Sequence, residues 1–308
     1  MKHIFIINPI AGQGKYQEKI LNDIHHHCTA LPCDFEVIQT QDIGEAYRIA
    51  AQYPPEVQAR FYAVGGDGTL NEMINGLMAR GCGEAGLIPC GTGDDFARVF
   101  QEKAPFLDID KQLKGTAQAI DLIRVCGRYA VNLCNLGIDA ETAADVHRFS
   151  RFLPGPVAYT VALVWRLFHR LGIEMKVTLD DKETFEGTYL LASFANGQAY
   201  GGGYFAAPKA EYNDGWMDVC IVKPISRLKF SQLLSQYKAG KHLDNDTFGP
   251  LLHYRRVKKA VFSTAKNQRF CIDGEIIATD SAEMEICPQA LRFILPYGAK
   301  LRGTLPIR

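Results

Sequence analysis

The chain has 308 residues, of which 47% are apolar and 22% charged, and its formal net charge is zero at pH 7. Such a composition excludes a disordered chain and a fibrous repeat, and the length allows two domains with a sizeable core in each. The nine cysteines are scattered without a C-x-x-C pair, which argues against a zinc module or a disulfide framework and favours a reducing cytoplasm.

Charge is divided unevenly along the chain. Residues 1–125 contain 11 lysines and arginines against 16 acidic residues, whereas residues 126–308 contain 23 against 18. An acidic first part suits a metal or a metal-nucleotide complex better than nucleic acid, so we expect no nucleic-acid partner. A mildly basic second part suits an anionic surface, although chance asymmetry explains the division equally well.

Residues 1–125 alternate short apolar runs with amphipathic segments. The runs expected as strands are HIFIIN, DFEVIQ, FYAVG, GLIPC and IDLIRV. Helices are expected near 15–28, 43–53, 69–80 and 94–119, the last broken around Pro105. This alternation predicts an α/β domain with a doubly wound parallel sheet, whose ligands lie beyond the carboxyl ends of the strands. The first apolar run stops at Asn8-Pro9, so we expect no signal peptide.

The pattern changes after about residue 125. Two helices, expected at 139–149 and 156–170, precede β-like runs that a helix near 226–239 interrupts: MKVTLDD, TYLLASFANG, MDVCIVKP, KAVFSTA, RFCIDGEII and LRFILP. We therefore expect a mainly antiparallel β-rich domain over 126–297, with the extreme C-terminus, about 298–308, returning to the first domain. The 13-residue run PVAYTVALVWRLF is too short to cross a bilayer, and such a run is more often a buried helix than one that dips into lipid.

The stretch FYAVGGDGTLNEMINGLMAR places a glycine-rich loop between an expected strand and helix. Loops of this kind usually hold phosphate, because bare N–H groups and the positive end of the helix dipole converge there. Asp67 at the centre would repel phosphate unless it binds a Mg²⁺ ion that the phosphates share, or accepts hydrogen bonds that shape the loop. Thr69 and Glu72 have the T-x-x-E spacing of a capping box.

Four further segments accompany this loop: NPIAGQGK at 8–15, GTGDDFAR at 91–98, NGQAYGGGYFAAPKAEYNDGWMDV at 196–219, and DGE at 273–275. Together with GGDGTLNE, this set resembles the bacterial lipid kinases of the diacylglycerol kinase catalytic family, which are related to sphingosine kinases. The resemblance extends over nearly the whole chain, and the five motifs occur in the same order. GGDGT alone would be less specific, because NAD kinases and phosphofructokinases carry a similar loop.

The resemblance implies roles for particular residues. ATP phosphates would be held by the loop from Gly65 to Asn71, with three residues completing the nucleotide site; the full set is Asn8, Thr40, Gly65, Gly66, Asp67, Gly68, Thr69, Leu70, Asn71 and Thr92. A charged network between the domains would contain Asp95, Arg98 and Asp121. Magnesium would be bound by the Asp214 side chain and the backbone carbonyls of Glu211 and Trp216. Glu275 would be the general base and Asp67 the second catalytic residue.

Plainer interpretations stay open for several of these residues. Asp95 can be a helix N-cap, Arg98 and Asp121 an ion pair without a catalytic part, and both Asp214-Gly215 and Asp273-Gly274-Glu275 ordinary turns. The family pattern has Asn where this chain has Asp94. That change either alters the nucleotide contacts or only exchanges one good capping residue for another.

The interpretation that the resemblance favours is an ATP- and Mg²⁺-dependent lipid kinase that phosphorylates the free hydroxyl of diacylglycerol or a related lipid, giving phosphatidic acid or its equivalent. We expect a cytoplasmic protein that contacts the inner face of the cell membrane transiently and peripherally, with its lipid substrate there; a homodimer is left open. Two alternatives remain: an NAD kinase-like phosphotransferase, and a non-catalytic module that binds lipid or nucleotide.

Overall fold

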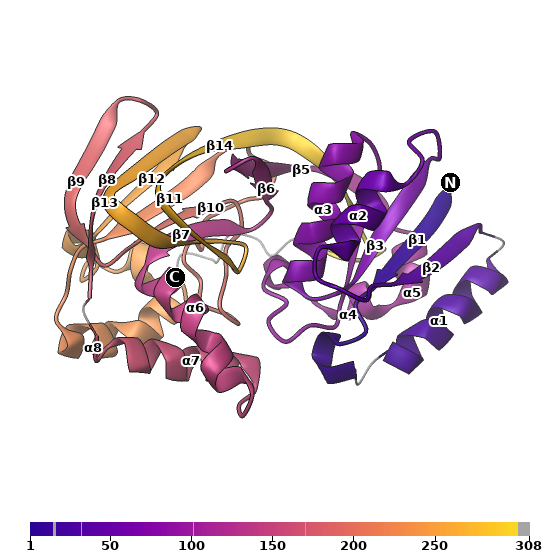
Figure 1. Cartoon of the computed structure of the whole chain (residues 1–308), viewed down its shortest axis with the longest axis horizontal. Coiled ribbons are helices and arrows are strands. Elements are labelled where there is room, and N and C mark those ends of the chain that lie inside the picture. The colour runs from indigo at the N-terminus through magenta and orange to yellow at the C-terminus, as the bar shows by residue number, and fades with distance from the viewer. Residues whose placement is uncertain (15–16, 32, 101, 170, 301–308) are drawn as a thin grey trace. The chain divides into compact units, whose positions relative to one another are not determined.

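The structure, a computed structural model, describes residues 1–14, 17–31, 33–100, 102–169 and 171–300. The chain forms two compact units (Figure 1). Unit 1 consists of Met1–Ile120 and the described residues from Gln289 on, and unit 2 consists of Asp121–Pro288. The end of the expected C-terminal return, residues 301–308, lies outside the described residues. The domain boundaries expected at 125 and 297 stay predictions.

Unit 1 contains a parallel sheet with helices between its strands (Figure 1). Across the sheet the order is β2 (Phe35–Gln39), β1 (Lys2–Ile7), β3 (Ala59–Gly65) and β4 (Glu84–Pro89), and the last part of β14 (Glu275–Leu295) pairs in parallel with β4. The helices are α1 (Gln17–Ala30), α2 (Glu45–Gln52), α3 (Asp67–Arg80), α4 (Ala104–Leu107) and α5 (Ile109–Leu113), with short 3-10 helices at Ala11–Gly14 and Phe96–Val99.

Helices cover both faces of this sheet. Four consecutive residues of β1, Ile4–Ile7, are buried, which requires that side chains on both faces are packed against other elements. Ile20, Ile24 and Cys28 of α1 recur every four residues and pack against one face. Because both faces of the sheet are covered, its strands form near-continuous apolar runs in the sequence.

The single broken helix expected over 94–119 is wrong. The segment contains the 3-10 helix Phe96–Val99, then α4 and α5, and the strand β5 (Thr116–Val125) begins inside it. Asp94 has a positive φ of 47°, which a helix cannot contain, and Pro105 lies in the first turn of α4. Separate short helices therefore form in place of one continuous helix. Asp108 begins α5, because its carboxylate accepts the N–H of Lys111.

Unit 2 is mainly antiparallel. Its sheet has the order β12 (Leu252–Val257), β11 (Met217–Val222), β10 (Leu191–Ala195), β7 (Leu133–Gly137), β13 (Lys259–Ile272) and β14. Strand β8 (Ile173–Leu179) pairs with β13 and with β9 (Glu183–Tyr189), and β5 pairs with β6 (Arg128–Ala130). The helices are α6 (Ile138–Ser150), α7 (Gly155–Arg166) and α8 (Arg227–Lys238), with short 3-10 helices at His242–Asp244 and Gly249–Leu251. These two units confirm the expected fold class.

Alternate residues of β10 divide between two cores. Ala192 and Phe194 pack with the β-strand core, whereas Leu191 and Ala195 pack with the helical core that includes Tyr159 and Leu163 of α7. The period of two is what a strand buried on both faces requires. No helix in the described part of the chain is long and apolar enough to cross a bilayer.

Candidate active site

Two glycine-rich loops of unit 1 meet backbone to backbone. They follow the neighbouring strands β3 and β4, which end at Gly65 and Pro89. A Cβ added to Gly91 would lie 2.5 Å from the Cα of Gly66, and one added to Gly65 would lie 2.4 Å from the hydroxyl of Thr69. Glycine is therefore required where these loops approach each other, quite apart from any ligand.

The Asp67 carboxylate joins the first loop to the second. Its Oδ2 accepts the N–H of Asp95 at 2.9 Å and its Oδ1 accepts the N–H of Phe96 at 3.0 Å. Burial raises the pKa of this carboxyl, whereas the two N–H groups and the Arg98 charge act in the opposite direction. Of the two roles that the sequence left open for Asp67, shaping the loop is therefore the one seen in these contacts. Sharing a Mg²⁺ ion with phosphate stays a prediction.

The expected capping box is wrong. Helix α3 begins at Asp67 with extended Gly66 as its N-cap, so Thr69 lies inside the first turn instead of preceding it. The Thr69 hydroxyl accepts the Asn8 amide at 3.2 Å, and the Glu72 carboxylate accepts the N–H of Gly44 at 2.9 Å. Both side chains thus fix neighbouring loops of unit 1 and leave the first N–H groups of α3 without a side-chain cap from this pair.

Three other residues predicted to bind nucleotide lie at the carboxyl ends of strands. Asn8 follows β1, Thr40 follows β2 and Thr92 is in the loop after β4. The Thr40 hydroxyl donates to the carbonyl of Ile7 at 3.3 Å, which links two neighbouring strand ends. Thr92 is exposed. The structure therefore brings these residues to the same edge of the sheet as the GGDGT loop.

Within the loop, the predicted residues differ in what they can offer a ligand. Leu70 is fully buried and its N–H donates to the Gly66 carbonyl at 3.1 Å, so it packs the core. Asn71 is also buried, and its backbone and side-chain oxygens accept the Asn75 amide at 2.9 and 3.2 Å. Gly68 is exposed with open space beside it. The first-turn N–H groups at Gly68 are therefore the ones an incoming phosphate could reach.

Asp94, the departure from the family pattern, is held from two directions. Its Oδ1 accepts the N–H of Gly91 at 2.9 Å, and its Oδ2 pairs with the Lys103 ammonium. Its φ of 47° lies in the left-handed region, which Asp and Asn adopt more readily than most residues. Burial raises the pKa of this carboxyl, and Lys103 opposes the shift. Asp94 thus closes the turn, and its charge is directed to Lys103.

The three residues predicted to form a charged network occur in different units. In unit 1, Arg98 Nε donates to Asp95 Oδ1 at 3.0 Å and Arg98 also donates to the Gly93 carbonyl at 3.1 Å. In unit 2, fully buried Asp121 accepts the N–H of Gly215 at 2.6 Å. Asp121 therefore shapes the loop that contains Asp214, and a network between the units stays a prediction.

The predicted metal site, Glu211 to Trp216, already contacts cationic side chains. Asp214 Oδ1 accepts the N–H of Trp216 at 2.9 Å, and its Oδ2 pairs with Arg256. The Lys258 ammonium donates to the Gly215 carbonyl and lies 3.8 Å from the centre of the Trp216 ring. Glu211 is exposed.

The oxygen atoms of this loop are chemically suitable ligands for Mg²⁺. In this structure, however, Arg256 pairs with the Asp214 carboxylate that the ion would need. Among the described residues no group of three His, Cys, Asp or Glu side chains is arranged to hold a metal. Two of the three predicted ligands are backbone carbonyls rather than side chains of this kind, so the predicted ligand set stays a prediction.

Glu275, the predicted base, follows the turn between β13 and β14. Its side chain is 45% exposed and pairs with Arg128. The turn itself is anchored by Asp273, whose carboxylate accepts the consecutive N–H groups of residues 131–133 at 2.6 to 3.0 Å. Sequence reasoning treated Asp273 only as a turn residue. Its long-range role has no local signal, because its partners lie about 140 positions earlier.

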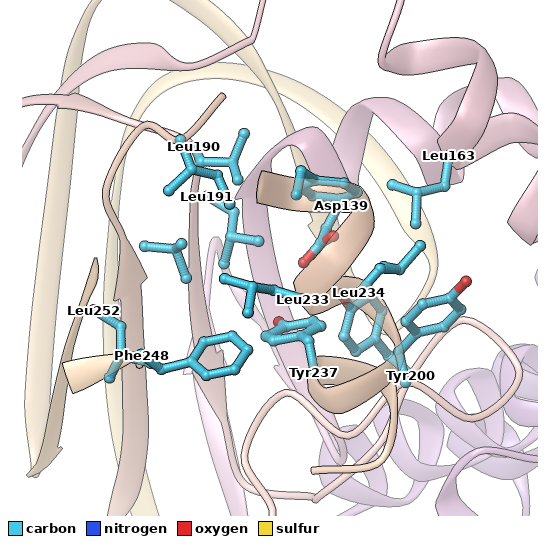
Figure 2. Close-up of a pocket in the computed structure, with 14 residues that line it drawn as sticks. Asp139, Leu163, Leu190, Leu191, Tyr200, Leu233, Leu234, Tyr237, Phe248 and Leu252 are labelled. Carbon is cyan, nitrogen blue, oxygen red and sulfur yellow. The ribbon is translucent and has the colours of Figure 1, made fainter. Parts of the chain in front are cut away.

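Unit 2 also contains an apolar pocket next to its helical core (Figure 2). The cavity itself has a volume of about 40 Å³. The lining comes from α6, α7, α8, β10, β11, β12 and adjoining loops. It consists of Asp139, Leu163, Leu190, Leu191, Tyr200, Tyr204, Val222, Ile225, Phe230, Leu233, Leu234, Tyr237, Phe248 and Leu252. The lining is as apolar as that of a small-molecule or lipid site, but the cavity is far smaller than the roughly 300–1,000 Å³ of such sites, so it must widen to take a ligand.

Asp139 is the one carboxylate in that lining, and Figure 2 shows it pointing into the pocket. It is 4% exposed, it interacts with the Tyr200 hydroxyl, and its Oδ2 has no hydrogen-bond partner. Burial raises its pKa to about 7. The groups that face it are other tyrosines and the thiols of Cys220 and Cys271, none of them cationic. Sequence reasoning missed Asp139, although an acid directly after the apolar run LCNLGI was a usable signal.

Two family profiles match the chain. The profile described as the diacylglycerol kinase catalytic domain matches residues 2–125, and the YegS C-terminal NAD kinase beta sandwich-like domain matches residues 132–295. A diacylglycerol kinase of Staphylococcus saprophyticus is 26% identical over 272 residues, which cover 88% of this chain and 87% of that protein. A Pseudomonas aeruginosa protein described as a probable lipid kinase YegS-like is 30% identical over 272 residues, covering 87% and 86%.

Solved structures show the same fold. A diacylglycerol kinase structure from Bacillus anthracis str. Sterne aligns with a TM-score of 0.68 and 21% identity, covering 96% of this chain and 97% of that one. An NAD kinase from Archaeoglobus fulgidus, solved in complex with ATP, aligns with a TM-score of 0.50 and 12% identity, covering 96% and 94%. At these identities the structural likeness establishes the fold alone.

Proposed function

Because this chain belongs to the family of diacylglycerol kinases and YegS-like lipid kinases, we propose that it transfers the γ-phosphoryl group of ATP to the free hydroxyl of diacylglycerol or a close relative. The products would be ADP and phosphatidic acid or its equivalent. The observation that carries the choice of acceptor is the apolar pocket in unit 2, in a chain whose unit 1 has loops suited to phosphate.

Unit 1 would bind ATP at the carboxyl edge of its parallel sheet. The accessible Gly68 region offers N–H groups at the positive end of the α3 dipole, and Asp67 holds the second glycine-rich loop against the first. Each oxygen of the Asp67 carboxylate accepts one backbone N–H, so hydrogen bonds within the protein partly offset the negative charge of Asp67. Mg²⁺, arriving with the nucleotide, would supply charge neutralisation at the phosphates.

Unit 2 would bind the acyl chains. An acyl segment that packs against leucine, phenylalanine and tyrosine walls gains free energy by leaving water, and a cavity of about 40 Å³ must widen to take even part of one acyl chain. Part of the lipid would therefore stay in the bilayer, which fits a peripheral enzyme. Glu275 would accept the proton of the attacking hydroxyl while the bond from the γ-phosphorus to the ADP oxygen breaks. Its solvent exposure leaves that carboxylate accessible once Arg128 moves.

Radiolabelled ATP and a total bacterial lipid extract test this proposal. The purified chain should transfer label to one lipid class that migrates with phosphatidic acid on chromatography. Transfer to NAD in place of lipid would support an NAD kinase-like enzyme. Nucleotide binding without transfer to any lipid would support a non-catalytic module; either result would overturn the proposal.

A further inference from the structure

Helix α7 is apolar on two opposite faces. One face packs inward, where Ala158, Ala162 and Leu163 are buried. The other has Val157, Val164 and Trp165 about half exposed, and Phe168, just after the helix, is 78% exposed. The spacing of 157, 164, 165 and 168 places these side chains on one stripe of the helix. The sequence favoured a buried helix over one that dips into lipid, and the structure shows one buried and one exposed face.

Neighbouring elements extend this stripe. Phe152, in the turn between α6 and α7, is 84% exposed, and Leu228 at the start of α8 is 70% exposed. Helix α6 packs against α7, and Arg227 donates to the carbonyls of Leu167 and His169 at the end of α7. Figure 1 shows α6, α7 and α8 together along one side of unit 2. We call the residues Phe152, Val157, Val164, Trp165, Phe168 and Leu228 the α7 face.

The charge around the α7 face is mainly basic, with partly exposed Glu141 of α6 paired to Arg166. The sequence has no acidic residue between Asp145 and Glu174, but four arginines and two histidines. Arg151 lies exposed at the end of α6, and exposed Arg227 lies beside Leu228. Asp145 is 3% exposed and paired with Arg166. An apolar, aromatic surface with a basic rim is complementary to the headgroup and acyl boundary of an anionic bilayer.

We propose that the α7 face is the surface by which this protein docks on an anionic phospholipid bilayer. The inference rests on the proposed function, since a lipid kinase must reach its substrate in a membrane. Leu163, adjacent in sequence to Val164, lines the apolar pocket, and so do Phe230 and Leu233 of α8. Docking through α7 and α8 therefore places the helices that wall the pocket at the acyl layer, from which a chain can enter it. The alternative is that a second copy of this chain covers the α7 face.

Vesicle sedimentation tests the docking surface. The purified full chain should bind vesicles that contain phosphatidylglycerol more strongly than vesicles of phosphatidylcholine alone. Trp165→Ser with Phe168→Ser should weaken that binding at least ~10-fold, since apolar burial supplies much of it. Ile43→Ser removes a 95% exposed apolar side chain from unit 1 and should change nothing. Arg151→Glu should weaken binding only to the anionic vesicles, and Lys19→Glu on α1 serves as its matched control.

Kinase assays distinguish the proposed docking surface from the proposed catalytic function. The double variant should phosphorylate a water-soluble, short-chain diacylglycerol as the wild type does, and lose activity only on diacylglycerol in vesicles. Unchanged vesicle binding by a folded double variant would overturn the docking surface. Loss of a dimer in the double variant, without any loss of vesicle binding, would identify a second copy as the occupant and overturn it too. Absence of all kinase activity, with vesicle binding still dependent on the α7 face, would refute the proposed function alone.

Discussion

The Asp67 carboxylate in the first turn of α3 accepts the backbone N–H of Phe96 at 3.0 Å, and its second oxygen accepts that of Asp95. One acidic side chain therefore joins the loops that follow β3 and β4. This explains how a carboxylate is accommodated in a loop suited to phosphate: it faces N–H donors of the protein, while the helix N–H groups at Gly68 remain accessible.

Asp67→Asn should damage both the loop and the reaction. The amide can accept with one oxygen only, and its NH₂ group would face an N–H donor, which should lower the free energy of unfolding by about 1–3 kcal/mol. We expect kcat/KM to fall at least ~100-fold, measured with ATP as the varied substrate. Asp110→Asn, in α5 of the same unit, is the control. Near wild-type kinetics and stability in the variant would contradict the role.

Asp94→Asn restores the residue of the family pattern and should be tolerated. The amide oxygen can still accept the N–H of Gly91, and Lys103 is half exposed and can turn to solvent. Because the Lys103 ammonium that pairs with Asp94 is half exposed, the variant should lose less than about 1 kcal/mol of stability at neutral pH. Isothermal titration with ATP should give an unchanged affinity. A large loss would show that Asp94 contacts the nucleotide.

Asp214 and Arg256 should act as a pair without a metal. In the absence of nucleotide, Asp214→Asn and Arg256→Gln should each lower Tm by a few degrees at most. The double variant should lose no more than Arg256→Gln alone, since Arg256 also lies 3.9 Å from buried Asp218. Added Mg²⁺ should not raise the Tm of the wild type. If Mg²⁺ raises it and Asp214→Ala abolishes the rise, the loop is a metal site after all, and Arg256 only fills it in the ion's absence.

Asp139 should make stability depend on pH. Its folded pKa of about 7 lies above the ordinary value of 3.8, so the folded protein keeps a proton that the unfolded chain releases between these values. Its contribution is fully present below pH 3.8 and is lost as pH rises to about 7, by roughly 4 kcal/mol at most. Asp139→Asn cannot titrate. Its stability relative to wild type should therefore increase from pH 5 to pH 8 in urea unfolding, and a constant difference would mean that Asp139 titrates normally.

The sequence predicted what depends on local pattern. Apolar runs located β1 to β4 of unit 1, and the GGDGT and GTGDD motifs located two loops that the structure brings together. The run IDLIRV, expected as a fifth strand of this sheet, lies in β5 and pairs with β6 and β14, and the strand that pairs with β4 comes from LRFILP instead. It did not predict contacts between distant segments, such as Asp273 with residues 131–133 or Arg256 with Asp214. The capping box at Thr69 failed because extended Gly66 is the N-cap, three residues earlier than the spacing implied. The pocket around Asp139 could not be foreseen, since its walls come from six elements of unit 2.

The central claim, phosphoryl transfer from ATP to a lipid hydroxyl, is tested most directly by mass spectrometry of the lipid product. Wild-type protein with ATP, Mg²⁺ and dispersed diacylglycerol should form phosphatidic acid and ADP in equal amounts. Glu275→Gln should keep ATP affinity and folding nearly intact while kcat falls ~100-fold or more, as expected for loss of a general base. Formation of ADP without a phosphorylated lipid, under conditions where the protein binds ATP, would contradict the claim.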